Sequence, residues 1–128
     1  MGTLSKAYAV DKSAAEDGKW QVTAGAVDVK VAKLGCPAFI AEVTRLQKPH
    51  LARLRSAAGD NDLHTSITIE AMAKTILLDW KVEQDGKPVP YTWELGVQAL
   101  TDYAEFKEDI SILSATRSNF RPEEISGK

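Results

Sequence analysis

The segment QDGKPVPY, residues 84–91, restricts the fold of this chain more than any other stretch. Asp85-Gly86 readily adopts positive backbone angles, which suits a tight turn. Pro88 and Pro90 fix their own φ angles, lack the N–H that a helix needs, and favour extended or turn conformations around the residue between them. Since no helix can run through this segment, we expect a proline-restricted turn that joins one helix to the next.

The longest helical pattern precedes this turn, in DLHTSITIEAMAKTILLDW, residues 62–80. Apolar residues recur along it at three- and four-residue spacing, in two rows. The first row is Leu63, Ile67, Ala71 and Leu78, and the second is Ile69, Met72, Ile76 and Trp80. A helix that is apolar on more than one face is the central helix of a domain or part of an assembly surface. The β-branched residues at 67–69 weaken helix propensity, so a strand there is the alternative.

Near the N-terminus, after a stretch without a sustained hydrophobic period, apolar and polar residues alternate. In KWQVTAGAVDVKVAKL, Val27, Val29 and Val31 share one face, and Trp20 and Val22 give an equivalent apolar face before the turn at Ala24-Gly25. This pattern predicts a two-stranded β-hairpin. A lone hairpin is marginal in water, so it needs helices packed on its apolar side.

Proline marks the start of two further helices. Pro37 suits the first position of a helix over residues 37–47, with Cys36 as a weak capping residue. Pro49 ends that helix and opens the next, which Gly59 terminates.

Two helices are also expected after the turn. Thr92 can cap WELGVQAL, and Asp102 can cap a final helix that Pro122 ends. The apolar positions of the final helix are Tyr103, Phe106, Ile110, Leu113 and Phe120.

These elements predict an α+β fold, predominantly helical, with an N-terminal β-hairpin packed on about five helices. We expect a flexible N-terminal arm over residues 1–17, a single globular domain over 18–121 and a polar C-terminal tail over 122–128.

Charge and hydropathy exclude other classes. The chain has 16 Lys and Arg against 18 Asp and Glu, for a net charge of -2, which is the wrong sign for general nucleic-acid affinity. Arg45, Lys48, Arg53 and Arg55 form a local basic exception, but no aromatic side chains interleave for base stacking. No apolar run reaches the roughly 18 residues of a membrane span, and no signal-peptide pattern opens the chain, so we expect a cytoplasmic protein.

Residue types that could carry chemistry are few and poorly spaced. Cys36 is the single cysteine, and His50 and His64 have no metal-binding spacing, so we expect no metal or cofactor and no enzyme activity. Asp79 and Glu83 would lie one helical turn apart and could act as an acid/base pair, but helix-end charge is the more frequent explanation of such a pair. A small hydrolase that uses Cys36 or this pair is the remaining enzymatic alternative.

Three segments taken in order resemble the small tail assembly chaperones of long-tailed bacteriophages, over residues 27–121. The segments are VKVAKLGCPAFIAEVTRLQKPHLARLR, MAKTILLDWKVEQDGKPVPYTWELGVQALTD and YAEFKEDISILSATRSNFR. The most specific parts are Leu78-Asp79-Trp80, Asp85-Gly86 followed by Pro88, Pro90 and Tyr91, and Asn119-Phe120. Cys36 departs from the asparagine of the GNPAF form.

The resemblance implies a non-enzymatic protein of the host cytoplasm that binds the tape measure protein, keeps it soluble and helps recruit tail tube subunits. Self-association is a further expected contact, and binding to nucleic acid or membrane is not expected. Such chaperones are often made in a longer, frameshifted form as well. The alternative is a structural virion component, such as a minor tail or head–tail connector protein.

Four aromatic residues are the candidate partner contacts: Trp80, Tyr91, Trp93 and Phe120. The competing interpretation is that they pack the core where the long helix meets the two C-terminal helices.

Overall fold

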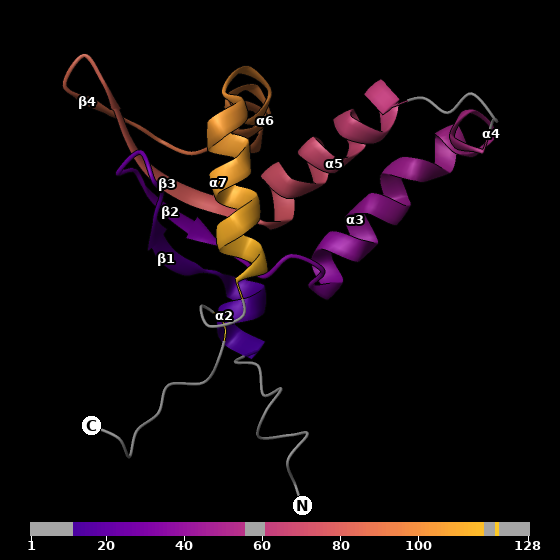
Figure 1. Ribbon diagram of the computed structural model, residues 1–128, viewed down its shortest axis with the longest axis horizontal. Helices are drawn as coiled ribbons and strands as arrows, with labels where there is room; N and C mark the ends of the chain where they lie inside the picture. The colour runs from indigo at the N-terminus through magenta and orange to yellow at the C-terminus, as the bar shows by residue number, and fades with distance from the viewer. Residues whose placement is uncertain (1–11, 56–60, 117–119, 121–128) are drawn as a thin grey trace, which may run out of the picture.

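The computed structural model describes residues 12–55, 61–116 and 120 (Figure 1). Its elements in chain order are α2 (Lys12–Asp17), β1 (Lys19–Val22), β2 (Asp28–Val31), α3 (Pro37–Gln47), the 3₁₀ turn η1 (Lys48–His50), α4 (Leu51–Leu54), α5 (Asn61–Thr75), β3 (Leu77–Gln84), β4 (Lys87–Val89), α6 (Trp93–Asp102) and α7 (Ala104–Ala115). The fold is α+β, as predicted. No helix among the described residues is long and apolar enough to span a membrane.

The four strands form one antiparallel sheet in the order β1-β2-β3-β4. The predicted N-terminal hairpin is confirmed as β1 and β2. Helix α7 packs against β2, α5 against β3, and α6 bridges α5 and α7. Helices α3 and α5 pack on each other and carry α4 to the end of the long axis that lies away from the sheet (Figure 1).

The core lies where the sheet meets α5, α6 and α7. Six members of this contiguous cluster that are as large as valine or larger have at most 1% exposure: Val29, Val31, Ile76, Leu77, Leu100 and Ile110. Helix α3 contains no fully buried residue, although Phe39 packs against this core. The α3–α4 part of the chain therefore covers the core less completely than the C-terminal helices do.

The predicted helix over residues 62–80 is wrong in its last part. Helix α5 ends at Thr75, and Leu77–Gln84 is the strand β3, which pairs with β2 through Val31↔Leu77 and Val29↔Trp80. Over residues 76–80 the apolar spacing fits both a helix and an alternating strand, and the pairing with β2 selects the strand. The alternative of a strand at 67–69 is excluded, because these residues lie within α5.

The segment 84–91 is therefore not a joint between two helices. It closes the hairpin of β3 and β4, with Gln84 opposite Lys87. The two loop residues both have positive φ, 54° at Asp85 and 78° at Gly86, which is the backbone of a type I′ turn. Pro88 lies on the edge strand β4, where a missing N–H is tolerated.

The predicted apolar face of the first strand is also wrong. Gln21, not Trp20 or Val22, pairs with buried Val29 and so shares its face of the sheet. Trp20 and Val22 point to the opposite face, where they are 42% and 60% exposed. The turn sets this register, because the Thr23 N–H donates to the Val27 carbonyl and holds the loop at a length that offsets the strands by one residue.

One further helix lies within the residues assigned to the N-terminal arm. Lys12–Asp17, placed in the N-terminal arm, forms α2, and the backbone N–H of Lys33 donates to the carbonyl of its buried residue Ala15. Residues 1–11 and the tail at 122–128 lie outside the described residues. The final helix ends at Ala115 rather than near Phe120.

The predicted helix caps are confirmed in part. The Thr92 hydroxyl accepts from the Leu95 N–H at 3.2 Å, as a capping residue should. Cys36 precedes α3 without a side-chain capping bond. Asp102 does not cap the last helix, because it is the final residue of α6 and Tyr103 takes the capping position.

Adding a methyl group should destabilise the protein more at Gly86, in the β3–β4 turn, than at Gly25, in the β1–β2 turn. We expect Gly86→Ala to lower the free energy of unfolding by about 1 kcal/mol, because an L-residue at this positive φ is strained. Gly25→Ala is the matched control, since its φ is not in the left-handed region and a Cβ there would make ordinary contact with Thr23. Urea denaturation of both variants measures the difference, and equal losses would contradict this account of the turn.

Candidate functional site

The β3–β4 hairpin brings two of the predicted contact residues together. The rings of Trp80 and Tyr91 lie edge to face, with centroids 4.9 Å apart and planes at 85°. Trp80 Nε1 donates to the Val89 carbonyl at 2.8 Å, which ties the middle of β3 to the end of β4. Phe106 of α7 lies 6.5 Å from the Trp80 ring on another side. Trp80 is thus half-buried and held by both a polar and an aromatic contact.

Tyr91 connects this hairpin to the helical layer. Its hydroxyl donates to the carbonyl of Ala73 in α5 at 2.5 Å. Burial, together with the charge of Asp79, raises the pKa of Tyr91, so the phenol stays protonated as a donor. Its ring also packs against Gly96 of α6, where a Cβ would overlap the phenol. Tyr91 therefore fixes the segment after β4 against both α5 and α6.

Trp93 lies apart from this pair, at the start of α6, and is 39% exposed. The Lys74 ammonium lies 4.3 Å from the centre of its ring, and Lys74 also binds Glu70 at 2.8 Å and Glu42 of α3 at 3.2 Å. One indole, one lysine and two carboxylates therefore join three helices, α3, α5 and α6.

Phe120 lies in the interior, with 1% of its surface exposed. Its side chain packs inside the domain in this structure, as the competing core interpretation expects. Of the four predicted contact residues, Trp80 and Tyr91 are adjacent, Trp93 is on a separate surface, and Phe120 is enclosed.

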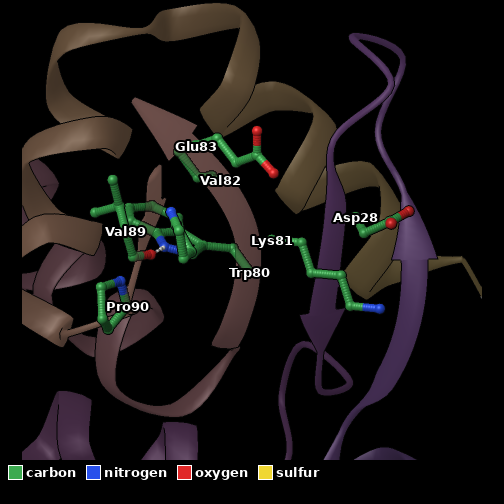
Figure 2. A pocket seen from close by; sticks show the side chains of 8 residues that line it. Asp28, Trp80, Lys81, Val82, Glu83, Val89 and Pro90 are labelled. Atoms are coloured by element: carbon green, nitrogen blue, oxygen red, sulfur yellow. Dashed lines mark hydrogen bonds between the residues drawn. The ribbon is translucent and has the colours of Figure 1, made fainter. Parts of the chain in front are cut away.

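A groove of about 700 Å³ borders the hairpin on one side of Trp80, and we name it the hairpin groove. It is lined by Asp28, Trp80, Lys81, Val82, Glu83, Pro88, Val89 and Pro90. Figure 2 shows the Trp80 ring beside Val89 and Pro90, with Lys81 and Asp28 directed toward the β1–β2 side and Glu83 at the far end. The groove thus joins an apolar wall to side chains of both charges.

A second depression of about 310 Å³ lies between the sheet and the C-terminal helices, and we name it the apolar recess. It is lined by Val27, Trp80, Val82, Ala99, Tyr103 and Phe106. Sequence reasoning placed Tyr103 and Phe106 on a helix without recognising this recess. The alternation of Trp80 with Val82 was the available signal, because it puts both side chains on one face of a strand.

The structure also shows where the residues considered for catalysis or metal binding lie. Asp79 and Glu83 lie four residues apart along a strand, a rise of about 13 Å, rather than one helical turn apart. Cys36 is buried at 5% exposure beneath the α3 N-terminus. Among the described residues, no three His, Cys, Asp or Glu side chains gather as a metal site would require.

The fold is that of a small α+β protein with open depressions beside a β-hairpin. Residues 34–127 match the family model described as YdaY prophage protein, which covers most of the chain. The chain therefore belongs to the YdaY prophage protein family, and it is a phage-derived protein. Searches of the curated proteins and of the solved structures found no match.

The Tyr91 hydrogen bond should contribute measurably to stability. We expect Tyr91→Phe to lower the free energy of unfolding by about 1–2 kcal/mol, because the change removes the partly buried donor to the Ala73 carbonyl. Tyr103→Phe is the matched control: Tyr103 is 66% exposed, and its change should be below about 0.5 kcal/mol. Denaturant melts of both variants test this, and equal effects would exclude a structural role for the Tyr91 hydroxyl.

The ion pairs of Glu42 with Arg45 and Lys74 should make the free energy of unfolding fall at acid pH. Hydrogen bonds from Arg45 and then Lys74 lower the pKa of Glu42 from 4.5 to about 2. Because the unfolded chain binds this proton more readily, the stabilisation is present above pH 4.5 and is lost as pH falls toward 2. We expect Glu42→Gln to lose about 1 kcal/mol at neutral pH, since the Arg45 side chain is largely exposed.

The measurement is a series of thermal melts between about pH 6 and about pH 3, for wild type and Glu42→Gln. The gap in stability between the two should narrow as the pH falls. A constant gap would show that the Glu42 charge does not stabilise the fold.

Proposed function

We propose that this phage-derived protein is a tail assembly chaperone that acts in the host cytoplasm. In this role it binds the tape measure protein, keeps it soluble and helps recruit tail tube subunits. The observation that carries the proposal is the hairpin groove, because it presents an apolar wall built on Trp80 together with charged side chains. The resemblance of the hairpin segment to tail assembly chaperones, and the membership of a prophage family, support the same role.

The distribution of apolar side chains supports a binding protein. Seven large apolar residues are exposed among those described: Trp20, Val22, Ile40, Leu51, Trp93, Tyr103 and Ile112. They are distributed over β1, α3, α4, α6, α7 and the residue that joins α6 to α7. A protein that coats a long, aggregation-prone partner needs contacts of this kind, which are individually weak and gain strength through repetition along the partner.

The structure suits displaceable binding in one further respect. Both polar atoms of the Trp80–Tyr91 pair are satisfied within the protein, by Val89 and Ala73. The groove wall therefore needs no partner to complete its hydrogen bonds. A tape measure segment bound there would be held by apolar contact and surface charge, and tail tube subunits could replace the chaperone.

Co-expression with the tape measure protein of the same phage tests the proposal. We expect the wild-type chain to raise the soluble fraction of the tape measure protein several-fold. Pro88→Asp should reduce this effect, because it places a charge on the exposed rim of the hairpin groove. Ile112→Asp is the matched control, since Ile112 is 55% exposed on α7 and does not line the groove.

Two outcomes would contradict the proposal. One is a tape measure protein that stays equally insoluble with and without this chain. The other is recovery of the chain at stoichiometric copy number from purified phage particles by mass spectrometry, which would identify a structural virion component.

A further inference from the structure

One end of the molecule carries a basic tip with an exposed leucine. The tip comprises Lys48–Arg55, KPHLARLR, in η1 and α4, and this segment contains no acidic residue. Lys48, Arg53 and Arg55 are exposed there, and Leu51 is 40% exposed. Figure 1 shows α4 at the end of the arm formed by α3 and α5, on the side away from the sheet. The tip is thus a projecting apolar side chain among positive charges.

An acidic depression adjoins the apolar recess at the other end. It measures about 530 Å³ and lies between the β1–β2 turn and α7. Three carboxylates line it: Glu105, Glu108 and Asp109. Val27 and Phe106 line both this depression and the apolar recess, so the two adjoin at these side chains. We name the combined area the acidic-apolar surface.

We propose that this protein self-associates head to tail, with the basic tip of one copy seated on the acidic-apolar surface of the next. Leu51 would enter the apolar recess beside Tyr103 and Phe106. The three basic side chains of the tip would face the three carboxylates of α7. Charge complementarity of this kind sets the orientation and the rate of association.

A second copy must supply the tip, because the two surfaces lie at separate places in one molecule. In Figure 1 α4 is at the end of the α3–α5 arm, whereas α7 lies in front of the sheet. Each copy carries one tip and one acidic-apolar surface, so the contact is heterologous. Contacts of this type repeat from copy to copy and form a ring or an open chain. This inference does not depend on the tape measure protein as a partner.

Charge reversal at exposed positions tests the contact. Sedimentation velocity of the purified full chain over a range of concentrations should show assemblies that grow beyond a dimer. They should weaken between about 50 mM and about 500 mM salt, because the contact is largely electrostatic. Arg55→Glu and Glu108→Arg should each weaken self-association by about tenfold or more, since each places like charges face to face.

Mixing the two variants gives the sharper result. The tip of each variant is complementary to the acidic-apolar surface of the other, so an equimolar mixture should regain assemblies of wild-type size. Trp20→Ser is the control, because Trp20 is exposed on the open sheet face and lines neither depression. Leu51→Ser tests the apolar part of the contact independently of charge. Thermal melts show that each variant is folded.

Several results would overturn the proposal. A chain that stays monomeric at all concentrations would exclude self-association. Assemblies unaffected by Arg55→Glu, Glu108→Arg and Leu51→Ser, or abolished by Trp20→Ser, would place the contact elsewhere. A mixture of folded charge variants that does not reassemble would show that these two surfaces do not face each other.

Discussion

The pairing of β2 with β3 is the constraint on which the rest of this structure depends. It aligns Val29 with Trp80 and Val31 with Leu77, and the Ala32 N–H donates to the Ile76 carbonyl where helix α5 gives way to the strand. Four of the side chains buried at this junction, Val29, Val31, Ile76 and Leu77, have no measurable exposure. Without this pairing, the first hairpin would have no sheet to join, and the second would have no fixed position over the helices.

This pairing is also the step that the sequence could not reveal. Over residues 76–80, ILLDW, a three- and four-residue spacing and a two-residue spacing fit equally well, because nearly every position is apolar. The choice is made by a strand more than forty residues earlier, which no local pattern can report. By contrast, Pro37 and Thr92 correctly predicted the starts of α3 and α6, because a proline at the first position and a capping hydroxyl act within a single helical turn.

The residues of the candidate site were likewise predictable only in part. The sequence drew attention to Trp80 and Tyr91 because both flank a marked turn, and the structure brings them together. It could not show that Phe120 is enclosed or that Trp93 is held by Lys74 from another helix, because both facts depend on tertiary packing. The apolar recess was missed for a related reason: it exists only if Trp80 and Val82 belong to a strand.

The aromatic pair explains how the protein keeps apolar surface open and still folds uniquely. An indole or a phenol can remain half-exposed at little cost when its polar atom is satisfied and its ring has one good contact. Trp80 meets these conditions through Val89 and Tyr91, and Tyr91 meets them through Ala73 and Trp80. The Tyr91–Ala73 hydrogen bond thereby ties the segment after the hairpin to α5, and the Trp80–Tyr91 ring contact links Trp80 to that segment without complete burial of the tryptophan. Trp80 consequently lines both the hairpin groove and the apolar recess, so the two depressions share one side chain as a wall.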